Sequence, residues 1–141
     1  MCRPVREPLG LHLTRVSRIV SRAFDDALAE GGGSLPAWLV LISLKGGQLA
    51  SQRELADAVG IQGATLTHHL NAMESAGLVT RRRDPRNRRL HVVELTPDGN
   101  ALFLRLRDAA MAFDERLRTG LSDHEVGQLE WLLTTLRDNV S

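Results

Sequence analysis

Six arginines lie within nine residues of this 141-residue chain, from Arg81 to Arg89. Asp84 is the one acid among them, so the segment carries a net charge of +5. The whole chain carries only +1, which leaves −4 for the remaining residues. Arginine donates hydrogen bonds in a planar fork that matches phosphate oxygens, so this cluster on a mildly acidic body favours nucleic-acid binding. A solvated surface loop is the alternative interpretation.

Cysteine and histidine can supply redox or metal chemistry, but their positions in this chain do not favour it. Cys2 is the only cysteine, which excludes an internal disulfide and a cysteine-based zinc site. Arg3 and Arg6 can favour its thiolate, so a redox-sensing regulator stays an alternative. The five histidines form no cluster with acids at ligand spacing, and no nucleophile motif or phosphate-binding glycine loop is recognisable. We therefore expect no enzyme, no metal and no cofactor.

Hydrophobic periodicity predicts the elements that must position the arginines. Apolar residues recur at three- and four-residue steps from Leu9 to Phe24, which predicts a helix over residues 9–29. Ser51 and Ser122 each precede a glutamate by three positions, the pattern of a capping box that opens a helix. Capping residues and glycines place further helices over about residues 34–46, 51–60, 62–75, 96–119 and 122–139.

A β-hairpin is predicted between the fourth and fifth helices. Residues 78–82 and 90–95 have strand composition, and the turn residues Asp84-Pro85-Arg86-Asn87 separate them. A short β-bridge near Ser51 is compatible with this sheet. The order α-α-α-α-β-β-α-α predicts a mainly α fold with a small β-wing (α+β). Within it, residues 35–96 form a winged helix-turn-helix.

The helix over residues 62–75 is the expected DNA reader. At about 100° per residue, Leu66, Leu70 and Met73 fall on one side, which we expect to face the core. The opposite side carries short, polar or methyl-bearing side chains and no acid, as contact with base edges requires. An ordinary solvent-facing helix surface is the alternative, and the adjoining arginine hairpin disfavours it. The outward residues are Ala64, Thr67, His68 and Asn71.

The hairpin arginines cannot all do the same work, because neighbouring strand residues point to opposite faces. Asp84 and Pro85 are expected to shape the turn, and Arg86 at its tip to enter the DNA minor groove. Asp84 is also expected to orient arginine side chains. We expect some arginines to bind phosphates and others to cover the protein's own surface. The full set of predicted DNA-binding residues is Ala64, Thr65, Thr67, His68, Asn71, Arg81, Arg83, Asp84, Arg86, Arg88 and Arg89.

The stretch from Leu55 to Gly99 resembles the MarR family of bacterial regulators. The wing carries the family's D-x-R-x-x-R pattern at Asp84, Arg86 and Arg89, and an L-T-x-x-G pattern follows it. Each motif alone is weak, whereas the ordered set is specific. One departure is Gln62, where family members often have a serine or threonine helix cap. The other matching pieces are Leu55-Ala56, Val59-Gly60-Ile61, Thr65 through Leu70, Met73-Glu74, Gly77-Leu78-Val79 and Leu95-Thr96-Pro97-Asp98-Gly99.

The helices that flank the reading unit carry more apolar residues than a small winged helix must cover. From the residues alone, a larger monomer core explains them equally well. The resemblance implies instead that residues 9–30 and 97–139 interlock two copies of a single MarR-like domain, residues 1–141, in a homodimer. A twofold dimer places two reading helices about one DNA turn apart, which predicts a pseudo-palindromic operator in double-stranded DNA.

The resemblance also implies a small aromatic or phenolic effector, held between the dimer helices and the reading unit. For Trp38 the alternative role is core packing, and for Arg15 it is solvation. The candidate lining residues are His12, Arg15, Val16, Trp38 and Ile42.

No apolar signal core follows the N-terminus, and the longest apolar stretch, residues 35–44, is about half of a membrane span. We read that stretch as a fully buried helix, and we expect a cytoplasmic protein with no membrane partner. The function expected from all of these features is a DNA-binding repressor, or less often an activator, that an effector releases. The alternatives are a redox sensor acting through Cys2 and a winged-helix protein-interaction module that does not bind DNA.

Overall fold

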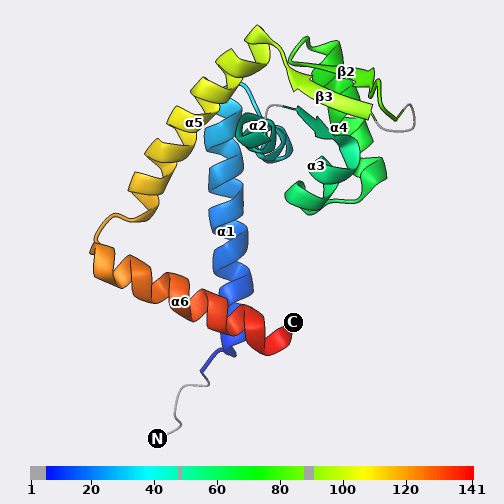
Figure 1. Ribbon diagram of the computed structural model, residues 1–141. Coiled ribbons are helices and arrows are strands. Elements are labelled where there is room, and N and C mark those ends of the chain that lie inside the picture. The colour runs from blue at the N-terminus through cyan, green and yellow to red at the C-terminus, as the bar shows by residue number, and fades with distance from the viewer. Residues whose placement is uncertain (1–5, 48, 88–90) are drawn as a thin grey trace, which may run out of the picture. The chain divides into compact units, whose positions relative to one another are not determined.

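The computed structural model of the chain describes residues 6–47, 49–87 and 91–141 (Figure 1). It confirms the predicted mainly helical fold with a small antiparallel sheet. The predicted order of helices and hairpin strands is present, and one short strand precedes the third helix. The elements are α1 (Leu9–Glu30), α2 (Leu35–Gly47), β1 (Leu49–Ser51), α3 (Gln52–Val59), α4 (Gly63–Ser75), β2 (Val79–Arg83), β3 (His91–Leu95), α5 (Pro97–Leu117) and α6 (Asp123–Val140).

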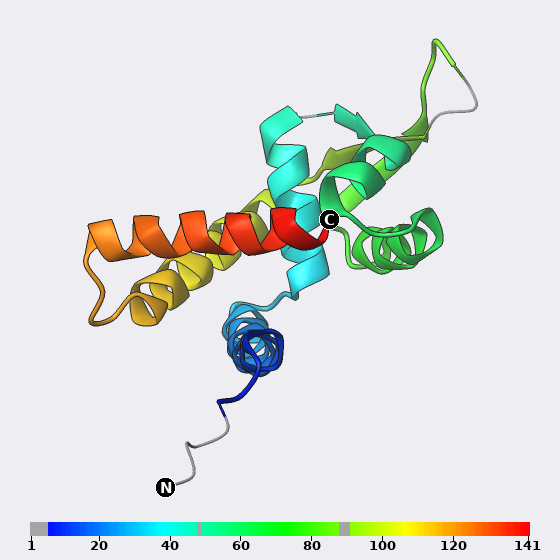
Figure 2. The ribbon, with the colours of Figure 1, turned by 90° about the horizontal axis from the view of Figure 1, so that it is seen from below.

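The sheet has three antiparallel strands in the order β1-β3-β2. Val79 pairs with Leu95 at one end of the hairpin, and Arg83 pairs with His91 at the other. Strand β1, where a bridge near Ser51 was expected, pairs along the other edge of β3, with Ala50 opposite Val93. The two hairpin strands thus belong to this sheet, and β1 extends it along β3. Figure 2 shows the tip of the hairpin projecting away from the neighbouring helices.

The chain divides into two compact units, Met1–Ala110 and Met111–Ser141. In the first unit one core joins α1, α2, α3, α4, the sheet and α5. Burial of each large aliphatic side chain there contributes about 1.5–3 kcal/mol. The interpretation of α2 as fully buried is wrong in part, because Ile42 on its outer side is 42% exposed. The core residues are Leu28, Trp38, Val40, Leu41, Leu44, Leu55, Leu66, Leu70, Met73, Val79, Val93, Leu102 and Leu106.

Hydrogen bonds connect the start of α5 to the residues that directly follow α4. The Thr96 hydroxyl donates to the Gly77 carbonyl at 2.6 Å and accepts from the Gly99 N–H at 3.0 Å. The Thr96 backbone N–H donates to the Leu78 carbonyl at 3.1 Å. A Cβ atom at Gly99 would lie 2.0 Å from that same carbonyl oxygen, so only glycine fits there. These contacts explain the L-T-x-x-G pattern as a joint between the reading unit and α5.

The second unit consists of the end of α5 and α6. The capping box predicted at Ser122 is formed: its hydroxyl accepts from the Glu125 N–H at 3.1 Å, and the Glu125 carboxylate accepts from the Ser122 N–H at 2.9 Å. At Ser51 the structure gives only the first of these two bonds, from the Glu54 N–H. Helix α6 has no buried residue.

Large apolar side chains are exposed along α1, α5 and α6. None of the helices in the described ranges is by itself long and apolar enough to cross a membrane. Helix α1 and residues Leu35–Gly46 reach the required length and hydrophobicity only when they are taken together, and a bend of 71° separates them. The exposed apolar residues of these helices include Leu9, Leu11, Leu13, Val16, Ile19, Leu104, Met111, Leu117, Leu129, Trp131, Leu132, Leu133 and Val140.

Candidate nucleic-acid interface

Helix α4 presents the side that periodicity assigned to DNA. Leu66, Leu70 and Met73 are buried in the core, as predicted. A left-handed Gly60, with φ of 77°, ends α3 and allows the tight turn into α4. Opposite the buried side, Thr67 is half-buried and the other predicted reading residues are exposed. These exposed residues are Ala64, Thr65, His68 and Asn71.

The N-terminus of α4 has no side-chain cap. Gln62 occupies the N-cap position, and its side chain makes no capping hydrogen bond. The serine or threonine common in the family would accept from one of the first backbone N–H groups. The departure at Gln62 therefore leaves the positive end of the α4 dipole without that internal acceptor.

Arg81, the first arginine of the cluster, points back onto α4. Its side chain is only 18% exposed and pairs with the Glu74 carboxylate at 3.1 Å. It also donates to Asn71 Oδ1, and its backbone N–H donates to Glu74 at 3.2 Å. Hydrogen bonds from Arg81 hold the pKa of Glu74 below its ordinary value of 4.5. The positive charge of Arg81 is therefore paired with an acid of the protein itself.

Gln52, at the start of α3, joins the same network and was missed by the sequence analysis. Its Oε1 atom lies 3.5 Å from Arg81 Nη1, and its Nε2 donates to the Thr67 hydroxyl at 3.3 Å. That hydroxyl in turn donates to the Gly63 carbonyl at 2.9 Å. No local pattern marks Gln52, because its partners lie 15 and 29 residues further along the chain.

The next two arginines face other surroundings. Arg82 pairs with Glu94 on β3 at 2.9 Å. Arg83 is exposed, and within the described ranges no side-chain hydrogen bond or ion pair holds it. Of these three consecutive arginines, two are therefore bound to acids of the protein, in keeping with the expected division of roles.

Asp84 organises the turn through the backbone. Its carboxylate accepts from the Arg86 N–H at 2.8 Å, the contact of an aspartate-stabilised turn. We expected Asp84 to orient arginine side chains, but among the described residues its partner is this amide. The side chain of Arg86 is exposed at the tip. Arg88 and Arg89 lie outside the described residues, as does Cys2 of the redox alternative.

Three acids of the described residues lie around this surface, and each has a partner within the protein. Glu74 pairs with Arg81, Glu94 pairs with Arg82, and Asp84 accepts from a backbone amide. Arg83 and Arg86 are therefore the exposed arginines of the described hairpin for which the structure gives no ion pair with an acid. Pairing of Glu74 and Glu94 with arginines reduces the repulsion that these carboxylates would exert on phosphate oxygens.

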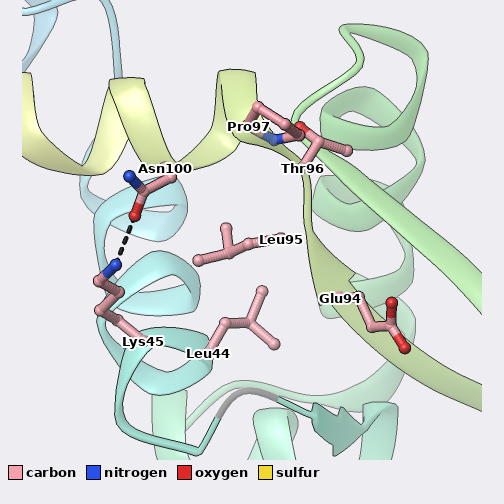
Figure 3. Close-up of a pocket in the computed structure, with 7 residues that line it drawn as sticks. All are labelled: Leu44, Lys45, Glu94, Leu95, Thr96, Pro97 and Asn100. Atoms are coloured by element: carbon pink, nitrogen blue, oxygen red, sulfur yellow. Dashed lines mark hydrogen bonds between the residues drawn. The ribbon is translucent and has the colours of Figure 1, made fainter.

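A separate cavity of about 630 Å³ lies where α2, β3 and α5 meet (Figure 3). Lys45 and Asn100 form one side of it, and the Lys45 ammonium donates to Asn100 Oδ1. Lys45 also lies 5.5 Å from the centre of the Phe103 ring. The apolar side chains of Leu44 and Leu95 line its middle, and Glu94, Thr96 and Pro97 complete the lining.

None of the five predicted effector residues lines this cavity. Trp38 is 8% exposed and stacks on Phe103, with ring centres 5.5 Å apart, which places it in the core. Arg15 pairs with Glu7 at 2.8 Å, and His12 lies 3.8 Å from the same carboxylate. Val16 and Ile42 are exposed. Among the described residues, no group of three or more His, Cys, Asp or Glu side chains is placed to hold a metal ion.

Comparisons with known proteins point to one family. The model described as "MarR family" matches residues 34–91. The Thauera aromatica protein named "Putative transcriptional regulatory protein for hcr operon" is 30% identical over 129 residues, which cover 91% of this chain and 78% of that protein.

Two solved structures of DNA complexes have the same fold. The transcriptional repressor CouR bound to a 23-mer DNA duplex is 28% identical, with a TM-score of 0.85 and coverage of 92% of each chain. A mutant MarR from E. coli complexed with operator DNA is 25% identical, with a TM-score of 0.82, and the match covers 92% of this chain and 93% of that one.

Proposed function

This chain belongs to the MarR family of DNA-binding transcriptional regulators, and from that premise we propose that it is a repressor that binds a pseudo-palindromic operator as a homodimer. One observation carries the proposal. The outward residues Ala64, Thr65, His68 and Asn71 of α4 lie beside a hairpin that exposes Arg83 and Arg86, while Glu74 and Glu94 are paired with other arginines. The likeness to a repressor bound to duplex DNA supports the sign of regulation.

In this proposal α4 enters the major groove and the hairpin follows the neighbouring backbone and minor groove. Arg83 and Arg86 contact DNA directly, together with Arg88 and Arg89 of the same segment. Arg81 and Asp84 act as positioning residues, because their polar groups are engaged within the protein. The base-facing residues are Ala64, Thr65, Thr67, His68 and Asn71.

The homodimer is proposed from the apolar surface of the flanking helices. Residues 9–30 and 97–139 expose leucines and a tryptophan that a monomer would leave in water. Large exposed apolar patches mark interaction surfaces, and a second copy can cover them through a twofold axis. Residues 35–96 then form the DNA-binding unit of a single domain spanning residues 1–141. Because its partner is DNA, the compartment we propose is the cytoplasm.

A small aromatic acid is the effector that we propose, bound in the cavity beside Lys45. The cavity combines an ammonium group, an amide and an apolar lining, which suits a carboxylate attached to a ring. In the site predicted from sequence, Arg15 is already paired with Glu7 and Trp38 is buried. A thermal-shift panel of benzoate derivatives tests this choice: Lys45→Ala should abolish the shift and Arg15→Ala should retain it. The reverse result would favour the predicted site, and no shift with wild-type protein would count against an effector of this class.

Fluorescence anisotropy with DNA from upstream of the protein's own gene tests DNA binding itself. If the dimer neutralises six to ten phosphates, the affinity should fall steeply with salt, with a log–log slope of roughly −0.9 per phosphate. Footprinting should show two half-sites about 10 base pairs apart. Absent or salt-independent binding would contradict the proposal and favour a protein-interaction module.

A further inference from the structure

We infer that Arg81 and Gln52 set the sequence specificity of α4 without contacting DNA: Arg81 holds Asn71 so that it offers its amide N–H groups to a guanine, and Gln52 holds Thr67 so that it offers its methyl group. The inference rests on the proposed function, in which α4 reads the major groove. It concerns which base edges the helix can select.

The orientation of Asn71 follows from the chemistry of its partner. Arginine has only donors, so the atom of Asn71 that faces the Arg81 guanidinium must be the oxygen Oδ1. Its amide nitrogen, with two N–H donors, then lies at the other side of the exposed amide group. The Arg81 contact therefore removes the ambiguity between the two ends of this side chain.

Arg81 is itself held firmly enough to impose that orientation. The Glu74 carboxylate binds both its guanidinium and its backbone N–H, at 3.1 and 3.2 Å. Its side chain is 18% exposed, so water competes weakly for these bonds. Glu74 and Asn71 lie three residues apart on α4, and one guanidinium spans both of them.

The fixed orientation of the Asn71 amide determines which bases it can recognise. An asparagine that recognises adenine uses both ends of its amide, accepting from N6 and donating to N7. Because Oδ1 is turned toward Arg81 and the N–H groups lie at the other end, Asn71 is better suited to an edge that presents acceptors alone. Guanine offers O6 and N7 side by side in the major groove. We therefore expect a guanine at the position that Asn71 faces.

Thr67 is restricted in a similar way. Its hydroxyl donates its proton to the Gly63 carbonyl and accepts from Gln52 Nε2, so it has no proton left to donate to a base. The methyl group remains for contact with DNA. A methyl group pairs with the thymine C5-methyl, and this contact needs no hydrogen bond.

Selection of binding sites from a random duplex library tests the inference, because it reports base preference separately from affinity. Asn71→Ala first identifies the position whose preference depends on Asn71. Arg81→Lys keeps the charge but has one nitrogen in place of the planar fork that contacts Glu74, Gln52 and Asn71, so it should hold Asn71 less firmly. Its expected effect is a loss of about fivefold to tenfold in the preference for guanine over adenine at that position. Arg82→Lys is the matched control, since Arg82 pairs with Glu94 and not with α4, and its preference should equal that of wild type.

Gln52→Ala provides a second, milder variant that leaves the hydrogen bonds from Arg81 to Glu74 and Asn71 in place. It removes the donor that holds the Thr67 hydroxyl from the side of α3, so Thr67 can rotate and the preference for thymine at the position facing it should broaden. Thermal unfolding checks that each variant is folded. The inference is overturned if wild type prefers adenine opposite Asn71, or if Arg81→Lys and Gln52→Ala weaken binding to all sequences equally. Failure of wild type to bind any DNA would instead refute the proposed function, and this inference with it.

Discussion

Arg81, Arg82 and Arg86 carry the same charge within six residues, yet each has a different partner. Arg81 is bonded to α4, Arg82 pairs with Glu94, and the Arg86 side chain is exposed at the tip of the turn. The differences arise from strand alternation in β2 and from the position of each residue along the hairpin. At the residue scale, charge alone therefore does not identify a DNA contact.

Arg86→Ala should weaken operator binding by about tenfold or more at physiological salt, because it removes the arginine that we propose enters the minor groove. Anisotropy titrations at several salt concentrations measure the effect. Arg82→Ala is the matched control: it removes one charge from the same hairpin, but from a residue engaged with Glu94. Equal affinities for wild type and Arg86→Ala would show that the minor-groove role is wrong.

The Glu74–Arg81 pair should make stability depend on pH in acid. The folded-state pKa of Glu74 is lowered from 4.5, so its carboxylate stabilises the fold above that pH. This stabilisation is lost as the pH falls through the lowered folded-state value. The difference in free energy of unfolding between wild type and Glu74→Gln should be constant above about pH 5.5 and shrink below pH 4.5.

Urea unfolding across this pH range, at one protein concentration, measures that difference. The same Glu74→Gln comparison in an Arg81→Ala background should depend much less on pH. A difference that persists unchanged in acid would mean that another group is responsible.

At the scale of elements, the joint between α4, the hairpin and α5 positions the reading unit. Thr96 binds the Gly77 carbonyl and the Gly99 N–H, and Gly99 packs directly on the Leu78 backbone. The cavity beside Lys45 is lined by the same start of α5 and the end of β3. A ligand there would contact the elements that carry the wing.

Gly99→Ala should destabilise the protein by about 1–3 kcal/mol or more, since the added Cβ would lie 2.0 Å from a backbone oxygen that cannot rotate away. Gly46→Ala is the matched control, because a Cβ at that helical glycine meets nothing within 4 Å. It should be neutral or stabilising by up to about 1 kcal/mol. Urea unfolding of both variants provides the comparison, and equal stabilities would contradict the close packing at Gly99.

At the scale of the whole molecule, the apolar surface lies on the helices that flank the reading unit in sequence. Helix α6 carries a stripe of apolar residues but buries none of them in the chain described here. Both hydrogen bonds of the capping box at Ser122 are nevertheless formed. The start of the helix is therefore well defined, although none of its side chains is buried. A second copy is the partner that we propose for this stripe.

Leu129→Glu should dissociate the dimer, because it places a charge in the middle of the exposed stripe of α6. Loss of a buried leucine alone costs about 1.5–3 kcal/mol, or roughly tenfold or more in the dimerisation constant. Thr134→Glu adds the same charge about 140° around the helix and should leave the dimer intact. Sedimentation equilibrium measures both. Unchanged self-association of Leu129→Glu would exclude this stripe as the dimer interface.

The sequence by itself determined the element order, the buried side of α4 and the hairpin, because these depend on residues a few positions apart. Leu66, Leu70 and Met73 share a helix face by geometry alone, and Ser122 and Glu125 cap a helix by their spacing. The likeness to a known family followed from the same local motifs. No tertiary information was needed for these features.

Only the tertiary structure decided which polar groups are used within the protein. Gln52 reaches Thr67 and Arg81 across 15 and 29 residues, and such contacts depend on how α3, α4 and β2 pack together. The same packing placed Trp38 in the core and opened the cavity beside Lys45. The physical reason is that a side chain's partners are set by distances in space, and residue types along the chain do not specify those distances.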